Sequence, residues 1–310
     1  MTLKELINIW LNKYVKHTIK LRTFITYQNI IDKHIIPFLG DYKLEELDPS
    51  IIQDFTLLKI EKGNLINGKE LAYNTVNSIV SVLKQALKCA YNLELITKDI
   101  TSKITLPQAK EKKIEVFDVK EQQLLESFCL SRKSNYIGIV LCLYTGLRIG
   151  ELLALTWEDI DFDKKLLSIN KNVCTIKING KSTLYVDEPK TKSSIRVIPI
   201  PKQLIPYLRK IKRSSSSIYV ITTKSNNMVG TRSYQKTYTR ILNKLNLKYR
   251  NFHSLRHTFA TRALELGMDV KSLSEILGHK NAMITLNRYS HSLLNYKIEM
   301  MNKLGKNMLQ

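Results

Sequence analysis

Apolar residues recur every three or four positions through most of the first hundred residues, which is the spacing of an amphipathic helix. The pattern predicts four helices: LKELINIWLNKYV (3–15), TFITYQNIIDKHIIPFL (23–39), DPSIIQDFTLLKIEKG (48–63) and NTVNSIVSVLKQALKCAYN (74–92). Gly40 follows the second helix, and Asp48 with Pro49 begins the third, so these ends carry the usual stop and start signals. Together the four segments predict a small helical bundle.

A change of pattern near residue 100 separates this bundle from the rest of the chain. The segment KDITSKITLPQAKEKKIEVF (98–117) contains a proline and a cluster of charges and has no helical period. We therefore predict a helical domain over residues 1–103, a linker over 104–113 and a second domain over 114–310. Two domains also suit a chain of 310 residues, because one domain commonly contains about 100–200 residues.

The second domain is predicted to be mainly helical with a small antiparallel sheet. Helical spacing appears in residues 121–129, 135–155, 233–247, 254–267 and 269–278. Between these segments the period changes, and three stretches rich in β-branched residues predict strands: KLLSINKN (165–172), KSTLYVD (181–187) and IRVIPIP (195–201). The turn signal NGK at 179–181 lies between two of these stretches, so we expect one sheet inside a helical domain.

The charge of the chain is large and uneven. The formal net charge is +22; residues 1–110 carry 15 Lys or Arg against 11 Asp or Glu, and residues 111–310 carry 34 against 16. Between Glu188 and Glu265 there are 17 basic residues and no acidic one. A solvated surface normally mixes both signs, so a stretch of one sign favours a polyanionic partner, with nucleic acid ahead of a membrane or an acidic protein.

Other features of the composition narrow the class of protein. No segment is long and apolar enough to span a membrane, and the polar residues throughout MTLKELINIWLNKYV (1–15) are not typical of a signal peptide, so we expect a cytoplasmic protein. The cysteines are too scattered for a zinc site or a disulfide framework and are predicted to be small buried apolar residues: Cys89, Cys129, Cys142 and Cys174.

Several separated segments carry candidate side chains that need one common explanation. TGLRIGEL (145–152) places Arg148 at a predicted helix start, just after Gly146. EPKTKSSIRVIPI (188–200) places Lys190 and Lys192 in a predicted turn between two strands. Each of these residues in isolation is more often an ordinary surface charge, so only the whole set of candidate residues indicates a function.

A second group of candidates lies between residues 252 and 291. FHSLRHTFA (252–260) supplies His253 and Arg256, which are three residues apart and so share a face if one helix contains both. LGHKNAMITLNRYSH (277–291) supplies His279, just beyond a predicted helix end at Gly278, and then Tyr289. We leave His257 and His291 as ordinary surface residues.

These pieces, in this order, resemble the tyrosine recombinases, the family of phage-type integrases and Xer-like recombinases. The resemblance covers residues 113–292 strongly and the N-terminal helices, similar to the family's SAM-like core-binding domain, more weakly. It implies a mainly α fold with a small antiparallel sheet in the catalytic domain, and two domains that close on duplex DNA like a clamp. It also implies an enzyme, a site-specific DNA recombinase that breaks and rejoins strands through a 3′-phosphotyrosyl intermediate during integration or excision of a mobile element or phage.

The resemblance also assigns a role to each candidate. Tyr289 is expected to be the nucleophile, and Arg148 and Arg256 to stabilise the charge that develops on the phosphate, since a guanidinium is always charged and forks onto two oxygens. His253 is expected to be the base or proton shuttle, and His279 to hydrogen-bond the scissile phosphate.

The resemblance implies that a lysine on a mobile β-turn donates a proton to the leaving 5′ oxygen. We assign this role to Lys190, and Lys192, two residues later, remains open. No metal and no other cofactor is expected, because the phosphotyrosine link preserves the bond energy for rejoining.

The expected partner is double-stranded DNA at core recombination sites. In the family four protomers assemble on two sites, so we expect a homotetramer on DNA, a monomer or weak dimer off DNA, no membrane partner and an optional directionality factor. The helical bundle begins almost at Met1, so we expect no arm-site-binding domain in front of it. KIEMMNKLGKNMLQ (297–310) has an amphipathic spacing that suits docking on a neighbouring subunit or folding back on its own domain.

Other functions stay open on the sequence. Within the family the chain is an alternative candidate for Xer-like dimer resolution or DNA inversion. A type IB topoisomerase shares these catalytic residue types, and a catalytically silent DNA-binding protein shares the scaffold. A zinc site formed by His253, His257 and His279 is a weaker alternative, because no cysteine or acidic ligand lies near them in sequence.

Overall fold

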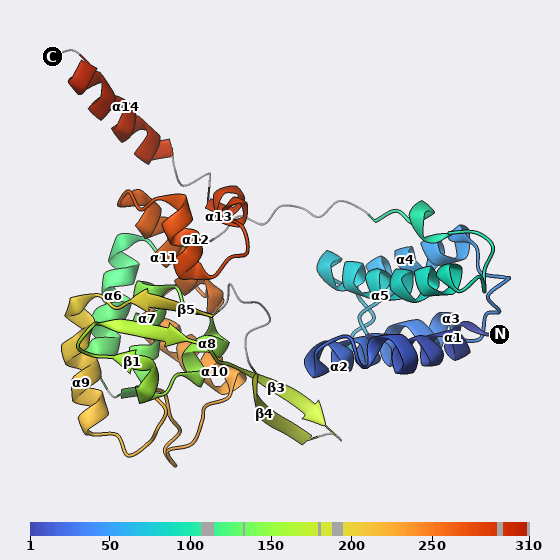
Figure 1. Cartoon of the computed structure of the whole chain (residues 1–310), viewed down its shortest axis with the longest axis horizontal. Helices are drawn as coiled ribbons and strands as arrows, with labels where there is room; N and C mark the ends of the chain where they lie inside the picture. Colours follow the sequence, from blue (N-terminus) through green and yellow to red (C-terminus); the bar gives the residue numbers. More distant parts are fainter. Residues whose placement is uncertain (107–114, 133, 179–180, 188–194, 290–293, 309–310) are drawn as a thin grey trace. The chain divides into compact units, whose positions relative to one another are not determined.

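The computed structural model describes residues 1–106, 115–132, 134–178, 181–187, 195–289 and 294–308 (Figure 1). Contacts between residues divide the chain into two compact units, Met1–Lys112 and Lys113–Gln310. Most of the predicted linker, residues 107–113, lies outside the described residues. In the part of the chain that is described, no helix is both long enough and apolar enough to cross a membrane.

The first unit is a bundle of helices at the predicted positions (Figure 1). Its elements are α1 (Leu3–Ile9), continued by the π-helical turn Trp10–Val15; α2 (Leu21–Ile30), continued by the π-helical turn Ile31–Ile35 and by α3 (Ile36–Leu39); α4 (Pro49–Lys62); and α5 (Tyr73–Asn92). Thr2 and Glu5 cap α1 reciprocally, and the side chain of Asp48 accepts a hydrogen bond from the amide of Ile51 at the start of α4. The sequence pattern therefore predicted these helices correctly.

The core of this unit forms where the apolar faces of the helices meet. Fully buried side chains from α1, the π-helical turn before α3, α4 and α5 compose its centre, among them Leu3, Leu6, Ile35, Ile52, Ile79 and Leu83. Ile104 also belongs to this core, and Gln53 exchanges two hydrogen bonds with the backbone of Thr105, at 3.1 Å and 3.2 Å. The first residues of the predicted linker thus pack on the helical unit.

The second unit is mainly helical (Figure 1). Its helices are α6 (Val119–Leu130), α7 (Ile137–Thr145), α8 (Ile149–Ala154), α9 (Ile205–Arg213), α10 (Thr231–Lys244), α11 (His253–Glu265), α12 (Val270–Leu277), α13 (Ala282–Tyr289) and α14 (Leu294–Met308), with short 3₁₀ turns at Ser134–Tyr136, Trp157–Asp159 and Lys202–Leu204. The pattern over residues 135–155 is divided between α7 and α8 because Gly146 adopts a left-handed conformation, with φ of 64°.

The described strands form two antiparallel sheets, whereas the sequence predicted one. β1 (Ile160–Asp161), β2 (Leu166–Ile169) and β5 (Arg196–Pro199) form one sheet in the order β1-β2-β5, and β3 (Asn172–Ile178) and β4 (Lys181–Asp187) form a separate hairpin. The predicted small antiparallel structure is present, but it is divided into two sheets because NVCTIKI is itself a strand and pairs with β4. β5 therefore returns to β2, far back along the chain, with Leu167 opposite Ile198.

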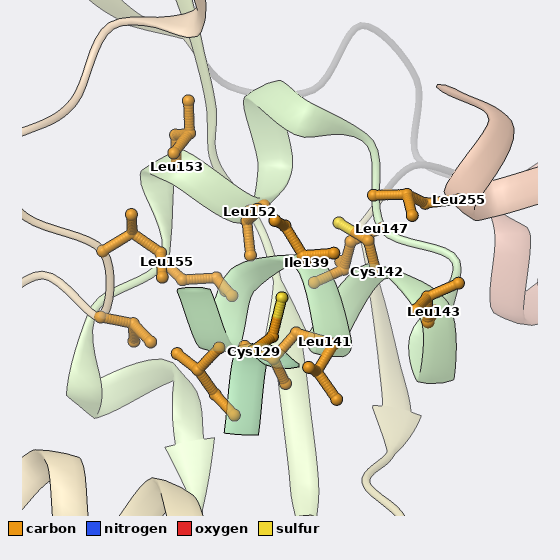
Figure 2. Close-up of a cluster of buried hydrophobic side chains, with 14 of the residues drawn as sticks. Cys129, Ile139, Leu141, Cys142, Leu143, Leu147, Leu152, Leu153, Leu155 and Leu255 are labelled. Atoms are coloured by element: carbon orange, nitrogen blue, oxygen red, sulfur yellow. The ribbon is translucent and has the colours of Figure 1, made fainter. Parts of the chain in front are cut away.

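The core of the second unit surrounds α7. The buried residues of α7 pack with residues of α6, α8 and α11, and Figure 2 shows a part of this cluster. The cysteines of both units behave as small apolar residues. In the second unit Cys129, Cys142 and Cys174 are buried, in the first unit Cys89 is half-buried, and all four thiols are free. Burial raises the pKa of the Cys129 thiol to about 12, so this thiol stays protonated near neutral pH. This packing fixes α8, which directly follows Arg148, and α11, which contains Arg256.

Candidate active site

Three arginines from other parts of the second unit donate hydrogen bonds to the carbonyl end of α12. Three successive carbonyls accept these hydrogen bonds. The carbonyl of Ile276 accepts from Arg196 Nε at 2.6 Å, that of Leu277 from Arg256 Nη2 at 2.7 Å, and that of Gly278 from Arg148 Nη2 at 3.3 Å. The last carbonyls of a helix have no partner within the helix and carry its negative dipole end, so they attract cations. The end of α12 thereby gathers Arg148 and Arg256, which are 108 positions apart in the sequence.

Two left-handed glycines make this arrangement possible. Gly278 ends α12 with φ of 64°, so the chain turns and presents His279 directly after the helix. Gly146 ends α7 in the same conformation, and a Cβ at this position would lie 2.6 Å from the ring of Phe259 and 2.7 Å from the side chain of Leu277. Any larger residue at Gly146 would push α11 and α12 away from the turn that carries Arg148.

Arg256 is buried and fully engaged. Its side chain is 2% exposed, and Nη1 donates to the carbonyl of Gly146 at 2.7 Å. Nη2 donates to the carbonyl of Leu277 and lies 2.9 Å from Nε2 of His279. Arg256 therefore joins the turn before α8 to the end of α12 and holds a guanidinium against an imidazole.

Arg148 has a more open position. It is the residue just before α8, its backbone amide donates to Oε2 of Glu151 at 2.9 Å, and its Nη1 donates to Oε1 of Glu151 at 2.8 Å. The side chain of Arg148 is 36% exposed, whereas that of Glu151 is 5% exposed. A ligand can thus reach Arg148 from solvent while the buried carboxylate of Glu151 holds the guanidinium from the protein interior.

Glu151 is a buried anion within a cationic cluster. Burial alone would raise the pKa of Glu151, but hydrogen bonds and charge from Arg196, together with the charge and backbone amide of Arg148, outweigh burial and lower this pKa to about 2. Arg196 is itself 7% exposed. The carboxylate is therefore ionised at neutral pH and offsets part of the positive charge of two arginines.

His279 is held at both ring nitrogens. Nε2 faces Arg256, and Nδ1 lies 2.8 Å from Oγ1 of Thr285, a fully buried residue of α13. His253 is the first residue of α11 and is exposed, and its ring lies edge-to-face on that of His257, with 4.6 Å between the centroids. The prediction that one helix contains His253 and Arg256 is confirmed, and His257, which we left as a surface residue, is the half-buried neighbour of His253.

Of the remaining predicted residues, Tyr289 belongs to a described helix, and the two lysines do not belong to the described residues. Tyr289 is the last residue of α13, and only its place in that helix is described. Lys190 and Lys192 lie outside the described residues, between the end of β4 at Asp187 and the start of β5 at Arg196. The segment that carries both lysines therefore connects the hairpin to the three-stranded sheet.

Three residues of this site were absent from the sequence prediction. Glu151 and Arg196 form the buried ion pair below Arg148, and Thr285 contacts His279. The spacing of Glu151 three residues after Arg148 at a helix start was an available signal, because this is the spacing of a capping box. Arg196 and Thr285 gave no comparable signal. Among the described residues, no three His, Cys, Asp or Glu side chains are grouped so that they could hold a metal ion.

Two protein-family models match this chain. Residues 116–295 match the model described as "Phage integrase family", and residues 2–56 match that described as "Phage integrase, N-terminal SAM-like domain". The chain belongs to the phage integrase family of tyrosine recombinases. The recombinase therefore carries the catalytic domain of a family of DNA strand-transferring enzymes, and the resemblance stated from the sequence is confirmed.

Individual relatives agree with this assignment. The recombinase is 32% identical to a tyrosine recombinase XerC-like protein of Caldanaerobacter subterraneus subsp. tengcongensis, over 98% of this chain and 83% of the relative. It is 27% identical to the transposase from transposon Tn916 of Enterococcus faecalis, over 86% of this chain and 69% of the relative. A solved structure of the Tn1549 transposon integrase in complex with transposon right end DNA is similar over 98% of this chain and the whole of that chain, with 25% identity and a TM-score of 0.81. The mainly helical fold with small antiparallel sheets is therefore the fold of this family.

Proposed function

We propose that this recombinase integrates and excises a mobile genetic element, with Tyr289 as the nucleophile that attacks the scissile phosphate. The observation that carries the proposal is the convergence of Arg148, Arg256 and His279 at the end of α12, which begins the short connection to the helix that ends at Tyr289. The transposon-encoded relatives support the assignment to a mobile element.

The two arginines are assigned to the phosphate. As the Tyr289 oxygen attacks phosphorus, negative charge grows on the non-bridging oxygens, and fixed guanidinium groups stabilise that charge without reorganising. The exposed Arg148 is the first arginine that the DNA meets. Arg256 is buried and exchanges a present hydrogen-bond partner for the phosphate, which it then stabilises from within the site.

Proton transfers are assigned to His253 and to a lysine. His253 removes the proton from the Tyr289 hydroxyl, whose ordinary pKa of about 10 keeps it protonated near neutral pH. Lys190 gives a proton to the 5′ oxygen as the bond from this oxygen to phosphorus breaks, and Lys192 is the alternative donor. Cleavage thus exchanges one phosphodiester bond for another, so the 5′ hydroxyl of a partner strand reverses the step without a nucleotide cofactor.

Recombination of two duplexes breaks four strands. With one Tyr289 in each copy, four copies are required if each strand is cut once, and we therefore propose a tetramer on two DNA core sites. The excess of basic residues in the second unit supports binding to DNA phosphates, with an affinity that falls as salt rises. The proposal includes a monomer or weak dimer without DNA, action in the cytoplasm and an optional directionality factor.

A second candidate function is resolution of DNA dimers. The 32% identity with the XerC-like relative favours it, because that relative is more similar to this chain than the Tn916 transposase is. The same chemistry serves both functions, and the DNA site separates them. Sites at the ends of a mobile element support integration and excision, whereas a single site in a circular host replicon supports resolution.

The test is recovery of covalently bound DNA. The chain is expressed with host DNA and denatured, and the DNA that stays attached to protein is sequenced. We expect attached DNA whose ends cluster at a short inverted-repeat sequence, none with Tyr289→Phe, and an unchanged yield with the matched control Tyr296→Phe. Attachment at random sequences would contradict site-specific recombination and favour a topoisomerase, and no attachment by the wild type would favour a catalytically silent DNA-binding protein.

A further inference from the structure

The ring of His279 is held between a cation and a hydroxyl group. Nε2 lies 2.9 Å from Nη2 of Arg256, and Nδ1 lies 2.8 Å from Oγ1 of Thr285. Arg256 is 2% exposed and Thr285 is fully buried, so water does not replace either partner easily. Both contacts have the length of a hydrogen bond, and the guanidinium of Arg256 fixes their direction, because the hydroxyl of Thr285 can either donate or accept.

A guanidinium has only donors, so Nε2 of His279 accepts the hydrogen bond from Arg256. A neutral imidazole carries one ring proton, which therefore lies on Nδ1 and is donated to the hydroxyl oxygen of Thr285. The opposite tautomer would direct the Nε2 proton at the N–H groups of Arg256, and a doubly protonated ring would add a second cation there. The contacts of His279 thus select the neutral form with its proton on Nδ1.

We propose that Thr285 is a positioning residue for strand cleavage, and that its hydroxyl fixes His279 in the Nδ1-protonated tautomer. This inference rests on the proposed function, in which Arg256 turns from Nε2 to the scissile phosphate. The imidazole then takes one proton from solvent water at Nε2 and becomes an imidazolium, so that Nε2 donates a hydrogen bond to a phosphate oxygen while Nδ1 still donates to Thr285. The hydroxyl of Thr285 thereby keeps Nε2 as the nitrogen that serves the phosphate in both states.

The place of Thr285 in the chain adds a second consequence. Thr285 lies in α13 four residues, or about one helical turn, before Tyr289. The hydrogen bond from His279 therefore ties the turn after α12 to the helix that ends at the proposed nucleophile. Rotation of α13 about its axis would break this hydrogen bond, so the bond also sets the position of the helix.

Valine and serine separate positioning from packing. Thr285→Val keeps the volume of the side chain but leaves the Nδ1 proton of His279 without its buried acceptor, or forces the other tautomer against Arg256. Thr285→Ser keeps the hydroxyl and removes one methyl group. If Thr285 only fills space in the core, the valine variant behaves like the wild type.

The first test is the ¹⁵N NMR spectrum of the histidine rings in the full chain without DNA, with His279 identified from a His279→Asn variant. We expect a protonated Nδ1 and an unprotonated Nε2 in the wild type and in Thr285→Ser, and a mixed or reversed pattern in Thr285→Val. A wild-type ring with its proton on Nε2 would overturn the proposal, and so would an unchanged tautomer in Thr285→Val. This test needs no cleavage, so it stands apart from the proposed function.

The second test is single-turnover cleavage of a nicked DNA substrate that carries the recombination site. A positioned proton donor contributes about 10²–10⁴-fold to a rate, so we expect Thr285→Val to cleave roughly tenfold or more slowly with unchanged DNA affinity. Thr285→Ser should restore most of the rate. Wild-type cleavage by Thr285→Val would overturn the proposal. Absence of cleavage by the wild type would contradict the proposed function instead, and the ring nitrogens would then decide the role of Thr285.

Discussion

The carboxylate of Glu151 accepts hydrogen bonds from both terminal nitrogens of Arg196, at 3.1 Å and 2.9 Å. Both side chains are almost fully buried, and the same carboxylate also holds Arg148 at 2.8 Å. Arg196 in turn donates to the carbonyl of Ile276 at the end of α12. Glu151 thus connects the exposed arginine of the site to a buried one, and loss of its charge would leave two guanidinium groups facing each other.

The first prediction concerns the pH dependence of folding. The pKa of Glu151 lies at about 2 in the folded chain against an ordinary value of 4.5. A folded-state pKa below the unfolded one stabilises the fold above the unfolded value, and this contribution is lost as pH falls toward the folded value. We expect Glu151→Gln to lower the free energy of unfolding of the second unit at pH 7 by on the order of 3 kcal/mol. The difference from the wild type should shrink as pH falls from 4.5 toward 2.

Urea unfolding at several pH values measures this difference. Glu158→Gln is the matched control, because Glu158 is an exposed residue near the end of α8 and its substitution should have little effect at any pH. A difference between wild type and Glu151→Gln that does not change with pH would show that the carboxylate is not stabilised by its arginines.

The second prediction concerns Gly146. Alanine at this position would adopt a left-handed conformation, and its Cβ would meet Phe259 and Leu277 at 2.6 Å and 2.7 Å. We expect Gly146→Ala to destabilise the second unit by roughly 2 kcal/mol or more and to reduce cleavage, because Arg256 binds the Gly146 carbonyl. Gly68→Ala is the control for backbone strain, since Gly68 has a similar φ of 66° but open space around its Cβ position. Equal destabilisation by the two alanines, measured in urea, would contradict the importance of the contacts.

The third prediction separates the two arginines. Arg148→Lys removes the fork of an exposed side chain, so we expect cleavage to fall by about 10²–10³-fold with the fold preserved. Arg256→Lys breaks buried hydrogen bonds to two carbonyls, so it should also lower the free energy of unfolding by about 3 kcal/mol. Single-turnover cleavage and urea unfolding of both variants measure the two effects. Equal destabilisation by the two substitutions would contradict the difference in burial.

The fourth prediction decides between the two lysines before β5. If Lys190 protonates the leaving oxygen, Lys190→Ala cleaves ordinary DNA slowly and recovers on DNA with a 5′-bridging sulfur, because a thiolate leaves without a proton. Lys192→Ala, the matched control, should cleave both substrates at similar rates. Recovery on the sulfur substrate by Lys192→Ala alone would assign the role to Lys192.

The sequence predicted the helices well and the sheets less well, for a physical reason. Helical periodicity is local, and segments such as 48–63 and 74–92 contain both their apolar face and their end signals. Strand pairing is not local: β2 pairs with β5 across an intervening hairpin, and no residue of β2 indicates that choice. The strand NVCTIKI was missed because it is short and directly follows the predicted strand over residues 165–172.

The site shows the same limit. Arg148, Arg256 and His279 were predicted because their order along the chain is distinctive, and the end of α12 joins them in the structure. Glu151, Arg196 and Thr285 were missed, because a buried partner is recognised by contacts that only the folded chain creates. The role of Tyr289 stays a prediction, since only its place at the end of α13 is described.

The residue that becomes covalently joined to DNA is the most direct test of the proposed mechanism. The covalent complex formed on a nicked substrate is digested with nuclease and protease, and the peptide that retains a nucleotide is sequenced by tandem mass spectrometry. We expect a 3′-phosphotyrosyl bond at Tyr289 and no modified peptide in Tyr289→Phe, with Tyr296→Phe unchanged. A nucleotide on Tyr296, on Ser290 or on any other residue would contradict the proposed mechanism.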